Sequence, residues 1–302
     1  QHGHRGPVAG VAGRLRQRYS RADGNLDRAA MRLQVQCCLA QNIQGLAVLG
    51  LATEVNKLSQ DEQLKILMWS MEDLEGRLPL AVTVSGPDAS TQIEFAKQAS
   101  DFGASWLILQ PPSRRPLEEE ECFEHFSKVM SSINLPVAIQ NAPEYLGVGL
   151  SAKKILELKK RHSNFQLLKG EGSAVVVEQL VQDLEGQMQV FNGRGGIELV
   201  DSLRAGCTGL IPAPELVDRQ VQIYQFWREE LFEEAEKLQS EILPIIVFSM
   251  QTIPHLICYG KRLLAARMGL NVFDRSPFQA PTKFGLQKIS EFASHLGPLP
   301  TN

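Results

Sequence analysis

The amino-acid sequence predicts an α/β fold, a (β/α)8 TIM barrel with a helical C-terminal extension. From Gly45 onward, short runs rich in Val, Ile and Leu alternate with longer amphipathic stretches. The runs are almost continuously apolar, as in strands that are buried on both faces of a parallel sheet. After Ala213 only helical patterns follow, and they exceed the single helix that closes such a barrel.

Seven candidate strands can be placed in order along the chain. Their spacing of roughly 25 to 30 residues per strand and helix, with room for one more strand before Gly45, favours a closed eight-stranded barrel over an open doubly wound sheet. The first strand would lie in PVAGVAG at residues 7–13, although this segment is rich in glycine and poor in residues that favour strands. The seven runs are residues 45–50, 80–85, 105–110, 136–141, 165–169, 188–192 and 209–213.

The helices between the strands carry start signals. Ser59 followed by Glu62 predicts a capping box at the start of one helix, and Ser151 precedes the apolar pattern of another. Beyond the last strand we expect four helices, at residues 216–227, 229–248, 255–270 and 282–296.

The chain is expected to divide into a barrel and its extension. We place the barrel at residues 1–228, with an atypical N-terminus at 1–22, and the extension, packed on the barrel, at 229–302. Residues 1–22 are rich in arginine and contain no acidic residue. A targeting peptide or a basic arm is therefore an alternative to an atypical terminus.

Composition argues against several kinds of partner. With 302 residues, 43% hydrophobic and 22% charged, the chain is typical of a globular protein, and its net charge of -3 gives no reason to expect a nucleic acid partner. No apolar run approaches the roughly 18 residues that span a bilayer, so we expect no membrane partner. The five cysteines are odd in number and show no CxxC, and the histidines share no metal-ligand spacing. We expect no metal, a reducing compartment and a cytoplasmic location.

Lys169 and Glu171 follow an apolar run that has the character of a buried strand. Side chains two apart on a strand point to the same face, and the active sites of such barrels lie at the carboxyl ends of the strands. Burial lowers the pKa of a lysine and favours the neutral amine that forms a Schiff base with a ketone, whereas a nearby carboxylate acts in the opposite direction. From these residues alone, a solvated surface ion pair stays an open alternative.

Five segments resemble, in order and spacing, the signature segments of the dihydrodipicolinate synthase and N-acetylneuraminate lyase family. They are GLAVLGLATEVNKLSQDEQ, DFGASWLILQPPS, LPVAIQNAPEYLGVGLS, LLKGEGS and RAGCTGLIP. The resemblance covers residues 23–282 and implies a barrel with a helical extension and a homo-oligomer, either a dimer or a tetramer. It also implies a covalent Schiff base between a 2-oxo acid and a lysine on the sixth strand, which is Lys169 by position, with no separate cofactor.

The sequence departs from this family where protons are moved. Gln140 stands where typical members carry a tyrosine, and glutamine cannot titrate. Leu-Ala-Thr-Glu at residues 51–54 replaces a common Thr-Thr-Gly-Glu, and Pro112 and Ser113 replace a pair of tyrosines. We therefore do not expect a true dihydrodipicolinate synthase. Glutamine at this position together with Lys-x-Glu on the sixth strand is similar to the 2-keto-3-deoxy-L-arabonate dehydratase branch of the family.

That similarity implies a dehydratase of 2-keto-3-deoxy sugar acids. Lys169 condenses with the C2 ketone, the iminium acidifies the C3 hydrogen, and Glu171 removes this proton and returns it to the departing C4 hydroxyl. Gln140 orients a substrate hydroxyl, and backbone amides near the end of the second strand hold the substrate carboxylate. The residues that we expect to contact the substrate are Ala52, Thr53, Asn141, Gly193, Arg194 and Ile211.

Several alternatives stay open at this point. Gln140 is also compatible with a buried polar residue whose hydrogen bonds are satisfied, and GRGG at residues 193–196 with a plain turn between a strand and a helix rather than an anion cradle. For the function, a retro-aldol lyase that releases pyruvate uses the same iminium, as does a synthase-like enzyme of the same family. A non-catalytic barrel that binds a 2-oxo acid is the alternative from outside the enzymes.

Overall fold

The structure, a computed structural model, describes residues 10–14, 19–113 and 117–301. Eight parallel strands follow one another in chain order around a closed barrel, and β1 pairs with both β2 and β8. The predicted α/β class is confirmed. The strands are β1 Gly10–Arg14, β2 Gly45–Val48, β3 Leu80–Val84, β4 Trp106–Leu109, β5 Val137–Asn141, β6 Phe165–Gly170, β7 Gln189–Asn192 and β8 Gly209–Leu210.

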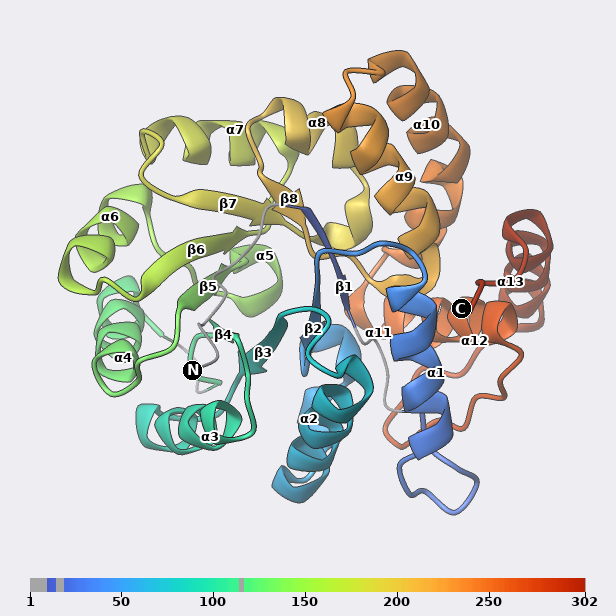
Figure 1. Cartoon of the computed structure of the whole chain (residues 1–302), viewed down its shortest axis with the longest axis horizontal. Helices are drawn as coiled ribbons and strands as arrows, with labels where there is room; N and C mark the ends of the chain where they lie inside the picture. Colours follow the sequence, from blue (N-terminus) through green and yellow to red (C-terminus); the bar gives the residue numbers. More distant parts are fainter. Residues whose placement is uncertain (1–9, 15–18, 114–116, 302) are drawn as a thin grey trace.

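Helices surround these strands on the outside of the barrel (Figure 1). Those that alternate with the strands are α1 Arg28–Leu39, α2 Gln60–Leu74, α3 Ala89–Asp101, α4 Glu119–Ser131, α5 Pro143–Leu146, α6 Ala152–Arg161, α7 Ala174–Asp183 and α8 Leu199–Arg204. Those that follow the last strand are α9 Val217–Arg228, α10 Phe232–Ser249, α11 Ile253–His255, α12 Lys261–Met268 and α13 Lys283–Leu296.

The predicted start signals form as expected. The Ser59 hydroxyl accepts a hydrogen bond from the Glu62 backbone N–H at 3.2 Å, and the Glu62 carboxylate accepts one from the Ser59 N–H at 3.0 Å, so the capping box of α2 is complete. Ser151 caps α6 through its side chain alone, which accepts a hydrogen bond from the Lys154 N–H. Both caps satisfy backbone donors that the first turn of a helix leaves without partners.

Alternation along the strands divides the core into two layers. Leu107 and Leu109 of β4 pack outward against the helices, whereas Ile108 belongs to a separate cluster inside the barrel. The interior cluster consists of Ala47, Ala81, Trp106, Ile108, Ala138, Leu167, Phe191 and Ile211. This apolar interior fills the barrel below the strand ends, so polar side chains that continue the same face emerge at the carboxyl end.

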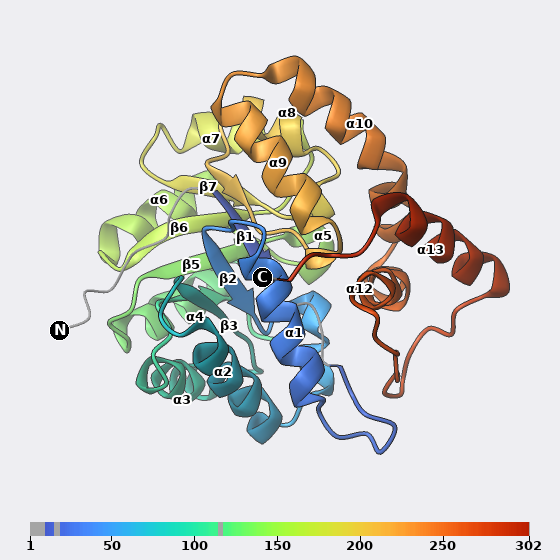
Figure 2. The same cartoon turned by 45° about the vertical axis from the view of Figure 1, so that its right-hand side comes forward.

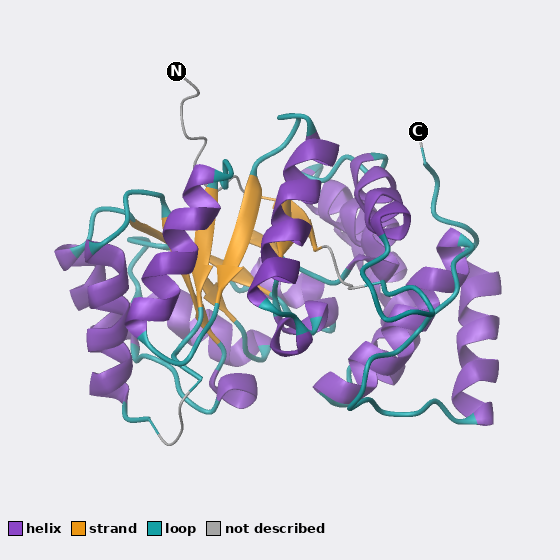
Figure 3. Ribbon diagram, turned by 90° about the horizontal axis from the view of Figure 1, so that it is seen from below, coloured by secondary structure: helices purple, strands orange, loops and turns teal. Residues whose placement is uncertain are grey.

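The helices of the C-terminal region lie on one side of the barrel (Figure 2). Ile242 of α10, Leu263 of α12 and Ile289 of α13 belong to the same buried core as the outer faces of the strands. In Figure 3, which views the molecule from below, the helices of the C-terminal region lie on the right. The barrel strands and the helices around these strands lie beside them. The division between residues 228 and 229 stays a prediction. Residues 1–9 and 15–18, which include most of the atypical N-terminus and part of the expected first strand, lie outside the described residues.

Within the described part of the chain, no single helix is long and apolar enough to cross a membrane. Phe232–Ser249 and Ile253–Met268 meet that test only as a pair, and they are bent by 107° at their junction. The junction is the short break at residues 250–252, and the second helix of the pair contains a π-helical segment, Leu256–Gly260, that follows α11. All five cysteines are free and buried.

Candidate active site

The site lies where β5 and β6 end side by side. Gln140 and Lys169 are direct partners in the register of these two strands. Each continues an inward-facing position of its strand, because Ala138 and Leu167, two residues earlier, belong to the interior cluster. Lys169 is fully buried and Glu171 is 8% exposed, so the alternative of a solvated surface ion pair does not apply.

A chain of side-chain hydrogen bonds crosses the strand ends. Gln110, which follows β4, donates from Nε2 to Gln140 Oε1 at 2.9 Å, and Gln140 Nε2 donates to Glu171 Oε2 at 2.9 Å. The other carboxylate oxygen, Glu171 Oε1, accepts from Lys169 Nζ. The carboxylate of Glu171 thus contacts the Lys169 amine directly, and Gln140 fixes the orientation of this carboxylate.

Gly193 leaves room for this carboxylate. A Cβ atom built on Gly193 would lie 1.9 Å from Glu171 Oε1, far inside any van der Waals contact. The requirement for glycine that the structure shows is therefore the space that the Glu171 carboxylate occupies. Gly193 therefore shapes the site by its lack of a side chain.

Arg194 and Tyr145 lie on opposite segments at the mouth of the site. Arg194 Nη1 donates to Glu198 Oε2 at 2.9 Å, and its Nε lies 3.9 Å from Glu144 Oε2. Burial by itself would lower the pKa of Arg194, but the hydrogen bond with Tyr145 and the two carboxylates raise it. Burial raises the pKa of Tyr145, and the guanidinium acts against this rise. Arg194 is therefore a cation whose charge two acids already balance.

A cavity of about 30 Å³ lies among these groups. Its walls are Leu51, Ala52, Gln140, Tyr145, Glu171, Arg194, Gly195, Ile211, Ala213, Met250, Ile253 and Leu256. A groove of about 1150 Å³ lies beside it, and Leu51, Tyr145 and Ile253 line both spaces. Since a water molecule needs about 10 to 15 Å³ of such volume, the inner cavity holds only about two waters. A larger molecule therefore fits the inner cavity only when lining side chains move.

The predicted substrate contacts fall into two groups. Ala52, Arg194 and Ile211 line the cavity. Thr53 is fully buried, and its N–H donates to the Gly50 carbonyl at 2.9 Å within the turn that precedes it. Asn141 holds the following loop, because its side chain accepts from the Leu150 N–H at 2.7 Å and donates to the Leu150 carbonyl at 3.1 Å.

Sequence reasoning missed several residues of the site. Gln110 could have been found, since it directly follows a predicted strand at the end where such barrels carry polar groups. Tyr145 follows the Asn-x-Pro segment but carries no spacing signal of its own. Met250, Ile253 and Leu256 come from the C-terminal helices, and nothing in their local sequence indicates a place at the barrel mouth. Among the described residues, no group of three His, Cys, Asp or Glu side chains could hold a metal ion.

Comparison with known proteins identifies the family of the chain. Residues 9–296 match the dihydrodipicolinate synthetase family. A 4-hydroxy-tetrahydrodipicolinate synthase of Alkaliphilus oremlandii is 22% identical over 66% of this chain and 69% of its own length. The Escherichia coli protein named "Probable 2-dehydro-3-deoxy-D-pentonate aldolase YjhH" is 23% identical over 76% of this chain and 78% of its own length.

Solved structures show the same fold. The 4-hydroxy-tetrahydrodipicolinate synthase of Methylacidiphilum fumariolicum superimposes with a TM-score of 0.86 at 21% identity and covers 95% of each chain. YagE of Escherichia coli, determined in complex with pyruvate, gives a TM-score of 0.87 at 20% identity, over 95% of this chain and 98% of its own. The chain is therefore a member of the dihydrodipicolinate synthetase family, whose enzymes are lyases that form a covalent Schiff base with a lysine and need no cofactor.

Proposed function

We propose that this protein is a Schiff-base lyase that acts on a 2-oxo acid, and that it dehydrates a 2-keto-3-deoxy sugar acid. Lys169 is the amine that condenses with the C2 ketone. The observation that carries the proposal is the carboxylate of Glu171, which accepts hydrogen bonds from both Lys169 and Gln140. This carboxylate is an acid–base group in direct contact with Lys169, in a site that has a glutamine where typical members carry a tyrosine.

The reaction follows from this geometry. The Lys169 amine adds to the C2 carbonyl, and loss of water leaves an iminium that acidifies the C3 hydrogen. Glu171 takes the C3 proton and an enamine forms. The enamine then expels the C4 hydroxyl, which leaves as water with the proton that Glu171 returns. Hydrolysis of the remaining imine restores Lys169, so the net change is the loss of one water from the substrate.

The hydrogen bond from Gln140 favours Glu171 as this base. Gln140 and the Gln110 that donates to it have no titrating group, so Gln140 orients the carboxylate without competing for its proton. Gln140 Nε2 and the polar groups beside it also offer donors and acceptors to a substrate hydroxyl at C4.

The part of the cavity wall that Arg194 forms favours a substrate that carries no second charge at the end remote from C2. Arg194 is the basic residue among the described residues that line the cavity, and Glu198 and Glu144 already balance it. A second substrate carboxylate would meet these acids and lack a cation to pair with. Hydroxyl groups, by contrast, can accept from Arg194 and donate to either acid. A polyhydroxy monoacid therefore fits this wall better than a diacid.

Retro-aldol cleavage is the second candidate. It uses the same iminium but breaks the C3–C4 bond, and it is favoured by the similarity to a relative that is named as a pentonate aldolase. Dehydration conserves all carbons in one product, whereas cleavage releases pyruvate and an aldehyde. Analysis of the products from one 2-keto-3-deoxy pentonate separates the two reactions.

Borohydride trapping tests the proposed class of reaction. The protein is incubated with pyruvate, and separately with a 2-keto-3-deoxy pentonate, then reduced and mapped by peptide mass. We expect a stable adduct on Lys169 and none in Lys169→Ala. Absence of an adduct on folded protein would overturn the enzyme proposal and favour a barrel that binds a 2-oxo acid without reaction. Glu171→Gln should still trap pyruvate but lose turnover, and unchanged turnover in this variant would remove Glu171 as the base.

We also propose a homo-oligomer, a dimer or a tetramer, in the cytoplasm. Membership of the family supports the oligomer. The free, buried cysteines fit a reducing compartment. Light scattering on the purified chain would measure the mass of the assembly, and a monomer at micromolar concentration would contradict this part of the proposal.

A further inference from the structure

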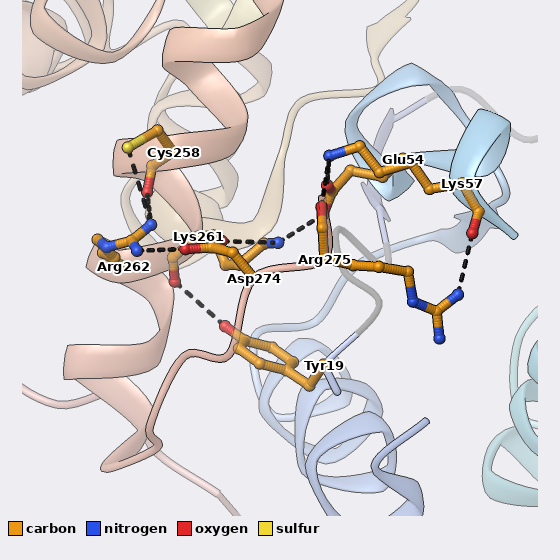
Figure 4. Close-up of polar contacts among 8 residues, drawn as sticks. All are labelled: Tyr19, Glu54, Lys57, Cys258, Lys261, Arg262, Asp274 and Arg275. Atoms are coloured by element: carbon orange, nitrogen blue, oxygen red, sulfur yellow. Dashed lines mark hydrogen bonds and ion pairs between the residues drawn. The ribbon is translucent and has the colours of Figure 1, made fainter. Parts of the chain in front are cut away.

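A buried network of charges links the loop after β2 to the C-terminal helices (Figure 4). Its centre is Glu54, which is 1% exposed and ends the short 3-10 helix Leu51–Thr53. Glu54 Oε1 accepts from Lys57 Nζ at 2.7 Å, and Oε2 accepts from Lys261 Nζ at 2.5 Å. One partner is local and the other lies 207 residues further along the chain, at the start of α12.

Glu54 has an unusual backbone. Its φ of 55° and ψ of 39° are left-handed, a conformation that costs a non-glycine residue free energy and persists only where its surroundings enforce it. The same residue ends one 3-10 helix and begins the next, Val55–Lys57. Its conformation therefore sets the direction of residues 51–53, of which Leu51 and Ala52 line the cavity.

Lys261 is held from several sides. It is 1% exposed, and its Nζ lies 3.6 Å from Asp274 Oδ1 as well as beside Glu54. Arg262 Nη2 donates to the other oxygen of Asp274 at 2.5 Å. Burial by itself would raise the pKa of Glu54, but Lys261 and Lys57 hold it below its usual value. Removing one member of such a buried pair leaves the other charge uncompensated.

The segment after α12 also contacts the loop after β2 through Arg275. Arg275 donates to the Lys57 carbonyl at 2.9 Å and to both oxygens of Glu62 at 2.7 and 2.8 Å. Lys57 Nζ in turn donates to the Arg275 carbonyl at 3.2 Å. The C-terminal helices thus contact the loop after β2 through reciprocal polar contacts as well as through the core.

We propose that Glu54 and Lys261 are positioning residues that hold residues 51–53 in the conformation that receives the carboxylate of the 2-oxo acid. The inference rests on the proposed function for the identity of the ligand. The C-terminal extension thereby acts on substrate affinity, although neither charged group lines the cavity. Loss of the pair weakens binding of the carboxylate and leaves the chemistry of Lys169 and Glu171 intact.

The test compares two ketones in the full-length protein. Pyruvate carries the carboxylate, and hydroxyacetone lacks it. Borohydride trapping on Lys169 is measured against the concentration of each ketone in the wild type, Glu54→Gln and Lys261→Met. We expect the half-saturating concentration of pyruvate to rise about tenfold or more, while that of hydroxyacetone changes less than about twofold and the limiting trapping rate is kept. Lys288→Met, which breaks the exposed Lys288–Glu291 pair of α13, should change neither.

Each other outcome contradicts the proposal in a distinct way. An equal shift for both ketones, or a loss of trapped fraction without any shift, means that the pair only stabilises the fold. If Lys261→Met does not fold, Lys261→Arg keeps the charge, changes its reach and allows the same comparison. If the wild type traps neither ketone, the proposed function fails. Amide hydrogen exchange then tests the positioning role of Glu54 and Lys261 by itself. Exchange over residues 51–57 must then rise in Glu54→Gln but not in Lys288→Met, and unchanged exchange overturns the positioning role.

Discussion

At position 193, glycine is required by the side chain of another residue. Gly193→Ala would place a methyl group 1.9 Å from Glu171 Oε1 and push the carboxylate away from Lys169. We expect turnover to fall by about a hundredfold, since small misplacements of a reacting group have effects of this size. Steady-state kinetics on a 2-keto-3-deoxy pentonate would measure the loss.

Gly45→Ala is the matched control for this substitution. A Cβ atom at Gly45 would meet Pro79 at 3.4 Å or more, an ordinary contact, and the position carries no left-handed backbone. This variant should retain activity. Equal turnover in Gly193→Ala and the wild type would show that Glu171 does not need its observed position.

His125 of α4 makes stability depend on pH. Burial lowers its pKa from 6.5 to about 4, although Asp88 acts in the opposite direction, and its Nε2 lies 3.0 Å from Gln92 Oε1. Between these pH values the unfolded chain binds more protons at this histidine, so stability is lost as pH falls from about 6.5 to 4. The loss reaches roughly 3 kcal/mol when the whole window is crossed.

Urea unfolding at several pH values would measure this dependence. His125→Gln can still hydrogen-bond Gln92 but cannot titrate, so it removes this contribution and leaves that of the carboxylates. As pH falls from about 6.5 to 4, we expect the unfolding free energy of the wild type to decrease steadily relative to that of the variant. A constant difference from pH 7 to pH 4 would contradict the assignment to His125.

At the scale of the element, the capping box of α2 has a measurable contribution. Ser59→Ala removes the hydroxyl that accepts from the Glu62 N–H. The free energy of unfolding should fall by about 1 kcal/mol, as is usual for the loss of an N-cap. Chemical denaturation would measure it, with Ser100→Ala near the end of α3, on an exposed face, as the control. A loss as large in the control would mean that the cap itself contributes little.

The strands were predictable because their burial on both faces appears directly in composition. Each of the seven expected runs begins within one residue of an observed strand, from β2 to β8. The first strand was expected at residues 7–13, and the described strand is Gly10–Arg14. It pairs with β2 and β8 through backbone atoms, and for this reason a glycine-rich sequence is sufficient to close the barrel.

The helix expected at 255–270 is interrupted in the structure. A single turn, Ile253–His255, leads through the π-helical segment Leu256–Gly260 into Lys261–Met268. The periodicity of apolar residues continues through all three pieces, and so it does not reveal the change in hydrogen-bond pattern. These pieces carry residues of the site, because Ile253 and Leu256 line the cavity and Lys261 donates to Glu54.

At the scale of the whole molecule, the barrel depends on its C-terminal helices. A chain that ends at Arg228 would lose Ile242, Leu263 and Ile289 from the continuous core and would leave Glu54 without Lys261. We expect this truncated chain to show no cooperative thermal unfolding by circular dichroism and to be largely insoluble. A soluble fragment with a sharp transition would instead show that residues 1–228 form an independent domain.

The sequence by itself determined the class of fold and the order of the strands, and it predicted Lys169 as the centre of the site. The fold and the strand order follow from local patterns, namely apolar runs and capping residues. The prediction of Lys169 follows from its place at a strand end together with the resemblance to the family. Tertiary structure alone decided which groups meet that lysine. The hydrogen bonds of Glu171 to Gln140, the space left by Gly193 and the pairing of Glu54 with Lys261 join segments far apart in the chain. Contacts of this kind depend on barrel closure and on the bend after α10, so they cannot be predicted from the local sequence.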